Sequence, residues 1–162
     1  MTTPNASSPR ILVSGASISG LTVAYWLARY GFEVTVVERA SHLRPGGHAL
    51  DVRGPALEVA SRMGVLSTIR DRSTKLTGIA VVDANGDELF RSTERTLTGG
   101  RLDSPDVEIL RDDLCRVLLE AVGARVEFVF GDFVTSLVQD EAGVDGEFAR
   151  RRRGGRRTVR TG

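Results

Sequence analysis

A glycine-rich segment near the start of the chain has residue types and spacing that suit phosphate binding. Gly15-Ala16-Ser17-Ile18-Ser19-Gly20 follows an apolar run and precedes an amphipathic stretch. The first glycine permits a tight turn from strand to helix, and the last lets the helix pack against the strand. Backbone N–H groups at the start of such a helix face an anion placed there. The segment therefore predicts a pyrophosphate-binding turn, and the alternative is a turn with a purely structural role.

Ser17 departs from the dinucleotide-binding pattern G-x-G-x-x-G, which has glycine at this position. Its Cβ narrows the approach of the backbone to a phosphate, although its hydroxyl group could itself donate a hydrogen bond to a phosphate. A glycine pattern alone is weak evidence. The elements around it must therefore decide what the turn does.

Glu38 is the second residue with a chemical role suggested by its position. It closes the run Glu33–Glu38 and lies 18 residues after Gly20. An acidic residue at about this distance accepts hydrogen bonds from ribose hydroxyls, whereas a site for a 2′-phosphate uses an arginine. We therefore expect Glu38 to bind ribose and to disfavour NADP at this site. The alternative is a solvated glutamate at the end of a strand.

The elements expected around these residues form a βαβ unit. Apolar and β-branched residues predict strands over Arg10–Ser14 and Glu33–Glu38, and helical spacing predicts a helix over Ile18–Tyr30. This order implies a right-handed crossover and a parallel sheet. Because neither strand has a polar face, both are expected to be central strands of a sheet covered on its two sides.

The rest of the chain adds further elements to this α/β fold. The patterns predict a helix from Pro55 to Met63, a helix over Arg111–Val122, a polar loop over Arg95–Asp106, and strands over Ala49–Val52, Leu76–Val82, Glu88–Arg91, Arg125–Phe130, Phe133–Val138 and Val144–Phe148. The strand over Arg125–Phe130 is expected to join the parallel sheet. The others give small antiparallel additions to it.

Three segments in this order resemble the FAD-dependent aromatic hydroxylases, the p-hydroxybenzoate hydroxylase-like group of flavin monooxygenases. They are ILVSGASISGLTVAYWLARYGFEVTVVERA, RPGGHALDVRGPALEVASRMGVL and VEILRDDLCRVLLEAV, so the resemblance covers residues 10–149. It implies a Rossmann-like FAD-binding domain. It also implies that full-length relatives use NAD(P)H and O2 to hydroxylate small aromatic or polyketide-type substrates. Serine in the middle glycine position is tolerated in this group.

The resemblance also implies which residues bind FAD. The pyrophosphate would lie on the glycine-rich turn, the adenosine ribose on Glu38 with Arg39 beside it, and two arginines would contact the cofactor. The complete set is Gly15, Ala16, Ser17, Ile18, Ser19, Gly20, Glu38, Arg39, Arg53 and Arg111. A guanidinium group suits phosphate oxygens because it forms two parallel hydrogen bonds with them. The alternative for each arginine is solvation at the surface.

Other features of the resembling family cannot be placed in this chain. These are a second flavin motif with an Asp-Gly pair, a later Gly-Asp pair under the flavin, and the large substrate-binding sheet. We therefore expect an incomplete FAD-binding domain, the N-terminal part of a monooxygenase, which is inactive alone. No residue is assigned a catalytic role.

The last 13 residues differ from the rest of the chain. Residues 150–162 hold seven of the 22 basic residues and none of the 21 acidic ones, so residues 1–149 carry a formal net charge of −6. We predict a disordered N-terminus over residues 1–9, the FAD-binding domain over 10–149, and an Arg/Gly-rich tail over 150–162 that is unstructured or translated out of frame. A second hypothesis is a non-catalytic NAD- or FAD-binding module whose tail contacts nucleic acid or an anionic surface. Nucleic acid is disfavoured because the tail lacks aromatic residues for stacking on bases.

Composition excludes several other classes of protein. The length of 162 residues suits about one domain, and 41% hydrophobic with 27% charged residues is ordinary for a soluble protein. There is no apolar run of about 18 residues and no secretory signal. The single cysteine, Cys115, is expected in a helix and partly buried, and it fits a reducing cytoplasm. His42 and His48 lack a cluster of further ligands, so no metal site is expected. The substrate, the choice of NADH or NADPH and the oligomeric state stay open.

Overall fold

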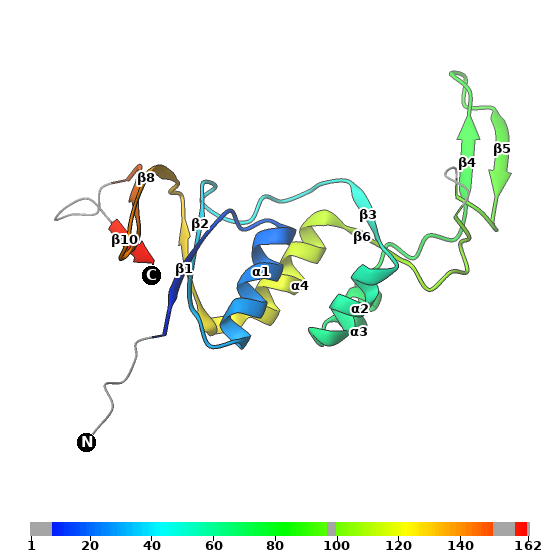
Figure 1. The fold of residues 1–162 in the computed structure, drawn as a ribbon. Helices are drawn as coiled ribbons and strands as arrows, with labels where there is room; N and C mark the ends of the chain where they lie inside the picture. The colour runs from blue at the N-terminus through cyan, green and yellow to red at the C-terminus, as the bar shows by residue number, and fades with distance from the viewer. Residues whose placement is uncertain (1–7, 97–99, 151–157, 162) are drawn as a thin grey trace. The chain divides into compact units, whose positions relative to one another are not determined.

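The computed structural model describes residues 8–96, 100–150 and 158–161 of the chain (Figure 1). These residues form two compact units. The first comprises the described residues up to position 45 and from position 114 onward, and the second comprises those between 46 and 113. Each unit has its own sheets.

A parallel three-stranded sheet is the centre of the first unit. Its strands are β1 (Arg10–Ser14), β2 (Glu33–Glu38) and β7 (Val126–Phe130), in the order β1-β2-β7. The pairings β1–β2 and β2–β7 are both parallel. The predicted βαβ unit and the predicted place of the third strand are therefore confirmed.

The position of β1 differs from the prediction. Among the described residues only β2 has a strand on each side, so β1 is an edge strand of this sheet. Burial agrees with this arrangement. Three valines of β2 are buried, whereas no residue of β1 is. The apolar composition of β1 predicted a central strand. Composition does not show whether β7 pairs with β1 or with β2, and in the structure it pairs with β2.

Helix α1 (Ile18–Arg29) connects β1 with β2 and contacts all three strands of the sheet. Its inner face buries Gly20, Leu21, Ala24 and Tyr25. The helix ends at Tyr30, next to Gly31, whose φ of +89° suits glycine. The helix predicted over residues 18–30 is thus confirmed to within one residue.

Helix α4 (Arg111–Val122) and the short 3₁₀ helix η1 (Gly123–Arg125) lead into β7. The part of α4 in the first unit buries most of its apolar side chains: Leu114, Cys115, Val117, Leu118 and Val122. Cys115 is only 4% exposed, so the predicted partly buried helical cysteine is in fact buried.

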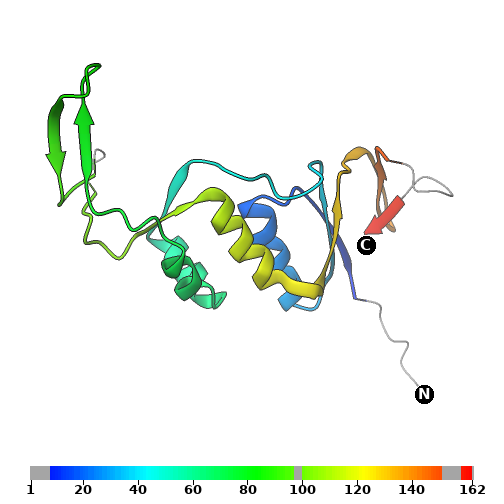
Figure 2. The same ribbon diagram turned by 180° about the vertical axis from the view of Figure 1, so that it is seen from behind.

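A second, antiparallel sheet of the first unit has the order β10-β9-β8. Its strands are β8 (Val134–Asp140), β9 (Gly143–Phe148) and β10 (Thr158–Thr161) (Figure 2). The predicted pair of strands after residue 132 is confirmed. The prediction of an unstructured tail is wrong for β10, which pairs with Val144–Glu147 of β9. The prediction followed the high arginine content of the tail and gave no weight to the short β-branched run over Thr158–Thr161. Residues 151–157 and 1–7 lie outside the described residues.

The second unit contains two small antiparallel pairs and two short helices. Strand β3 (Ala49–Val52) pairs with β6 (Val107–Leu110), and β4 (Ile79–Val82) pairs with β5 (Glu88–Ser92). The helices are α2 (Pro55–Arg62) and α3 (Leu66–Asp71). The buried apolar side chains of this unit come from β3, α2, α3, β6 and the residues directly after α2. They are Val52, Ala60, Met63, Val65, Ile69, Val107 and Ile109. The sequence predicts β3, α2 and the β4–β5 hairpin but neither α3 nor β6.

The turn of the β4–β5 hairpin is held by Asp83. Its Oδ1 accepts the backbone N–H groups of Asn85 at 2.8 Å and Asp87 at 2.9 Å. These hydrogen bonds favour the charged carboxylate and so lower the pKa of Asp83, the bond from Asp87 most strongly. The Asn-Gly turn predicted between the two strands is therefore built around this side chain.

Candidate functional site

The glycine-rich turn leaves β1 in a conformation that requires glycine. Gly15 has a φ of +104°, and its N–H donates to the carbonyl oxygen of Val37 on β2 at 2.7 Å. A residue with a Cβ is strained at this φ. A Cβ built on Gly15 would nevertheless meet no atom within 4 Å. The turn is thus fixed to the neighbouring strand and open on its outer side.

Gly20 is required for a different reason, which is close packing. It is buried in the first turn of α1, and a Cβ built on it would lie 1.9 Å from the carbonyl oxygen of Gly15. No side chain fits there unless the backbone moves. The missing Cβ lets α1 start directly against the turn, as its position in the motif predicts.

Ser17 caps α1 and organises the N–H groups of its first turn. Its Oγ accepts the N–H of Gly20 at 3.2 Å, and its carbonyl oxygen accepts the N–H of Leu21 at 2.8 Å. The first four N–H groups of a helix have no acceptor inside the helix. Among the described residues, the N–H groups of Ile18 and Ser19 have no acceptor and can serve an external one, and the Ser17 hydroxyl hydrogen can be donated as well. The φ of −81° at Ser17 is ordinary, so serine causes no backbone strain here.

Glu38 connects the turn with the end of β2. Its Oε2 accepts the N–H of Ala16 at 2.9 Å, and its Oε1 accepts the N–H of Ala40 at 2.9 Å. The side chain is partly buried, so it is not simply a solvated glutamate at a strand end. Each carboxylate oxygen has two lone pairs and can accept another hydrogen bond. A hydroxyl group could thus bind Glu38 without displacing either backbone partner.

The ends of β2 and β7 are joined beside Glu38. The N–H of Asp132 donates to the carbonyl oxygen of Glu38 at 3.1 Å, and the N–H of Gly131 donates to that of Ala40 at 2.8 Å. Arg39 is exposed, and its guanidinium carbon lies 4.8 Å from the centre of the Phe133 ring. This arrangement places Arg39 next to Glu38 at the carboxyl edge of the sheet, where ligands of parallel sheets bind.

Asp132 is a residue of this edge that the sequence interpretation missed. It is 5% exposed, and its Oδ1 accepts the N–H groups of Phe133 at 2.9 Å and Arg150 at 3.0 Å. The side chain therefore holds the segment that follows β7. A Gly-Asp pair directly after an apolar strand was the only signal of it in the sequence.

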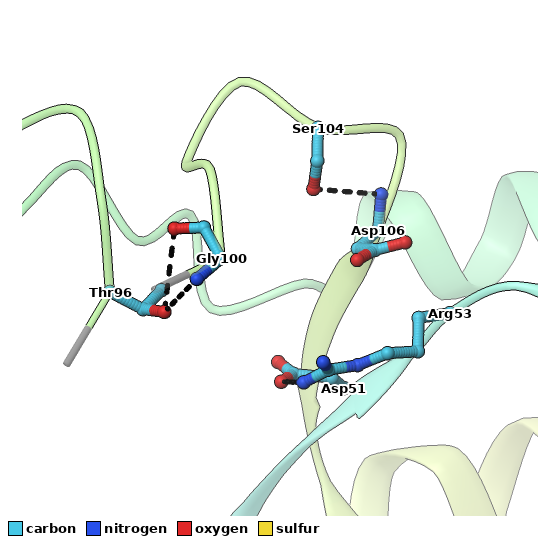
Figure 3. Close-up of polar contacts among 6 residues, drawn as sticks. All are labelled: Asp51, Arg53, Thr96, Gly100, Ser104 and Asp106. Atoms are coloured by element: carbon cyan, nitrogen blue, oxygen red, sulfur yellow. Dashed lines mark hydrogen bonds and ion pairs between the residues drawn. The ribbon is translucent and has the colours of Figure 1, made fainter. Parts of the chain in front are cut away.

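Arg53 lies in the second unit, directly after β3. Its guanidinium group forms an ion pair with the Asp51 carboxylate, and its side chain is 57% exposed (Figure 3). The arginine is therefore neither buried nor simply solvated. The ion pair uses Arg53 Nη2, so the N–H groups on Nε and Nη1 remain for a phosphate.

Arg111, also in the second unit, starts α4 and holds a glycine turn. Its Nη2 donates to the carbonyl oxygen of Gly46 at 3.0 Å, while the carboxylate of Asp112 accepts the N–H of Gly46 at 3.1 Å. A Cβ on Gly47 would lie 2.7 Å from Arg111 Nε. The guanidinium group thus packs on the bare backbone of the Gly46-Gly47 pair.

The structure divides the predicted site residues between the two units. The first unit brings together the glycine-rich turn, Glu38 and Arg39, and the second contains Arg53 and Arg111. Within the described ranges, no group of His, Cys, Asp and Glu could hold a metal ion. None of the helices in those ranges has the length and hydropathy needed to span a membrane.

Curated relatives resemble most of this chain but are much longer. An uncharacterised protein of Mycobacterium tuberculosis (strain ATCC 25618 / H37Rv) is 50% identical over 140 residues, which make up 86% of this chain and 38% of that protein. A flavin-dependent monooxygenase from an unknown prokaryotic organism is 37% identical over 139 residues, which make up 86% of this chain and 35% of that protein.

Solved structures share the fold. The tetracycline destructase Tet(51) superposes with a TM-score of 0.79 and 37% identity, over 95% of this chain and 37% of that one. The flavin-dependent monooxygenase PieE, solved in complex with FAD and substrate, gives a TM-score of 0.76 and 25% identity, over 98% of this chain and 30% of that one. The chain therefore spans 38% or less of the length of each relative named here.

The family model of the FAD binding domain matches residues 9–162. This match includes the basic segment over residues 150–162, which the sequence interpretation had separated from the domain. Together with the parallel βαβ unit and its glycine-rich turn, the match shows that the chain belongs to the FAD binding domain family.

Proposed function

We propose that the first unit binds the ADP portion of FAD, with the pyrophosphate at the start of α1 and the adenosine ribose on Glu38. The observation that carries this proposal is the hydrogen bond from Ala16 to Glu38, because it joins the two parts of the site in one unit. Ile18, Ser19 and the Ser17 hydroxyl group supply donors for the pyrophosphate. Glu38 supplies acceptors for ribose hydroxyls, with Arg39 beside it.

The space around the turn fits a phosphate group. Gly15 has no atom within 4 Å of where a Cβ would project, and the side chains of Ser17 and Ser19 are exposed. The positive end of the α1 dipole favours a negative charge at this place. The negative charge of Glu38 disfavours a 2′-phosphate on the ribose bound here.

We further propose that Arg53 and Arg111 also contact the cofactor. A guanidinium group has five N–H donors. Arg111 uses one of them on Gly46, and Arg53 shares its donors with Asp51. Both arginines therefore have N–H groups left for phosphate oxygens or for the flavin carbonyl groups.

For the longer protein we propose a flavin-dependent monooxygenase that uses NAD(P)H and O2 on a small aromatic or polyketide-type substrate. Relatives described as flavin-dependent monooxygenases and as a tetracycline destructase support this activity. Bound FAD would supply the redox chemistry, while the protein binds and orients it. We also propose a cytoplasmic location, which suits a protein whose single cysteine is buried and cannot form a disulfide within the chain.

Replacing Glu38 tests the FAD site. The Glu38→Ala variant should bind FAD about tenfold to 100-fold more weakly, since losing acceptors for buried or ordered hydroxyl groups costs about 1–3 kcal/mol. The measurement is a titration of the 162-residue chain with FAD, followed by flavin fluorescence. Glu33→Ala is the matched control, because Glu33 is an exposed glutamate at the opposite end of the same strand. Equal FAD affinity of wild type and both variants would contradict the assignment.

Turnover tests the proposal that this chain is an inactive part of the enzyme. The purified chain with FAD, NADH or NADPH, and a panel of phenols and polyketide aromatics should give no hydroxylated product. The physical reason is that a chain with 38% or less of the length of its relatives surrounds a bound flavin with less protein, and the exclusion of water protects reactive intermediates. Hydroxylation coupled to NAD(P)H consumption would refute the proposal. A titration with NAD alongside FAD separates the alternative, because a NAD-binding module would prefer NAD.

A further inference from the structure

A polar cavity lies entirely in the second unit, outside the glycine-rich turn of the first. Its volume is about 480 Å³, and Figure 3 shows part of its wall. The wall comes from the end of β3, the end of α3 with the segment after it, and the segment that leads into β6. Of the residues proposed to bind FAD, Arg53 alone lines this cavity.

Four cationic side chains line the cavity, and two of them are already neutralised. Arg53 forms an ion pair with Asp51, and Arg101 forms one with Asp103. The remaining two are different. Among the described residues Arg70 has no ion pair, and Lys75 Nζ donates only to the carbonyl oxygen of Arg70, at 2.7 Å. Two residues that line the cavity thus carry a positive charge without a carboxylate partner among the described residues.

The segment that carries Lys75 is held firmly. Ser73 forms a β-bridge with Ile109, and the N–H of Thr74 donates to the carbonyl oxygen of Glu108 at 2.9 Å. Lys75 then adopts a φ of +56°, which is uncommon for a residue other than glycine and which the surrounding contacts must maintain. The ammonium group therefore has a defined place on the Arg70 carbonyl oxygen before any ligand arrives.

Acidic groups limit the charge that the cavity can accept. Asp106 and Glu108 also line it, and the Glu108 carboxylate accepts the Thr74 hydroxyl group at 2.6 Å. Two carboxylates beside two unpaired cations disfavour a doubly charged anion, because like charges repel at short range. One negative charge shared between a guanidinium and an ammonium group is the better match.

We propose that this cavity binds a small molecule through a single negatively charged oxygen group of the carboxylate type, with Arg70 and Lys75 as the donors. The Ser104 hydroxyl group of the wall accepts the N–H of Asp106 at 3.3 Å and can donate its own hydrogen to the ligand. The site goes beyond the proposed FAD site, because its two anchoring residues belong to neither the glycine-rich turn nor the arginines assigned to FAD.

The test is an NMR titration of the 15N-labelled chain with sodium acetate, and separately with sodium phosphate at pH 7.5, at constant ionic strength. Acetate should shift the Thr74, Lys75 and Asp106 amide signals to saturation, and phosphate should bind more weakly. The Arg70→Gln variant should bind acetate about tenfold more weakly, the loss expected for one charge-assisted hydrogen bond. Lys75→Asn should do the same, and asparagine tolerates the positive φ. Asp106→Asn should strengthen acetate binding.

The matched control is Arg62→Gln, which removes one positive charge from α2 outside the cavity. Acetate affinity should not change in this variant. Absence of saturable shifts, tighter binding of phosphate than of acetate, or equal losses in Arg62→Gln and Arg70→Gln would each overturn the proposal. FAD titration of the Arg70→Gln variant should match wild type, so failure of the FAD site and failure of this site give different results.

Discussion

The Gly20→Ala variant should unfold at a markedly lower temperature than the wild-type chain. Its new methyl carbon would lie 1.9 Å from the carbonyl oxygen of Gly15, which is backbone and cannot rotate away. Overpacking of this kind typically costs about 1–3 kcal/mol, and contact with a fixed backbone atom lies at the upper end. Total stabilities are about 5–15 kcal/mol, so the loss is large. Thermal unfolding followed by circular dichroism measures it.

Ser19→Ala is the control for this experiment. Ser19 is the preceding residue of the same helical turn and is exposed, and alanine is the better helix former. This variant should unfold at the wild-type temperature or slightly above it. If Gly20→Ala unfolds at the same temperature as Ser19→Ala and binds FAD like wild type, then α1 does not start against the turn as described.

The Gly15→Val variant should lose FAD binding by at least about 100-fold while keeping most of its fold. Valine would not clash inside the turn, because the space beside Gly15 is open. Two other effects weaken binding. A β-branched residue is strained at a φ of +104°. Strain of this kind costs about 1–3 kcal/mol, and the side chain would occupy the volume proposed for the pyrophosphate.

Gly86→Val separates strain from occupied volume. Gly86 has a φ of +92° and is equally open, but it lies in the hairpin turn of the second unit. Its strain should lower the unfolding temperature about as much as Gly15→Val does, with FAD affinity unchanged. If the two valine variants bind FAD with comparable affinity in a fluorescence titration, the glycine-rich turn is not part of the cofactor site.

Local patterns predict the parts of the fold whose boundaries are set by nearby residues. The β1-α1-β2 unit follows from a glycine turn between two apolar runs, and α2 follows from Pro55 at its first position. The sequence patterns did not predict strand β6, because Val107–Leu110 is only four residues long and its burial depends on pairing with β3, which lies 55 residues earlier in sequence at the Val52–Val107 pair. The sequence patterns did not predict helix α3, because it has only six residues and no side-chain cap. Short elements of this kind are defined by their partners.

The same distinction applies to the candidate site. The residue types of Gly15, Gly20 and Glu38 and their spacing along the chain match a known motif, so the sequence identifies these residues as candidates. Their contacts depend on the fold. Nothing in the sequence shows that Glu38 accepts the N–H of Ala16, that Asp132 is buried beside it, or that Arg111 holds Gly46. Side chains separated by 22 or more positions meet only once the sheet and helices are assembled.

The bond between Glu38 and Ala16 makes one carboxylate serve two purposes. It orders the glycine-rich turn in the free protein, so cofactor binding need not pay for ordering that backbone segment. The same group is proposed to select the sugar. A mutation that changes the sugar preference at Glu38 therefore also loosens the turn that holds the phosphates. Evolution toward a phosphorylated ribose would require a second change that restores an acceptor for the Ala16 N–H, and its amide hydrogen exchange rate would reveal when that acceptor is missing.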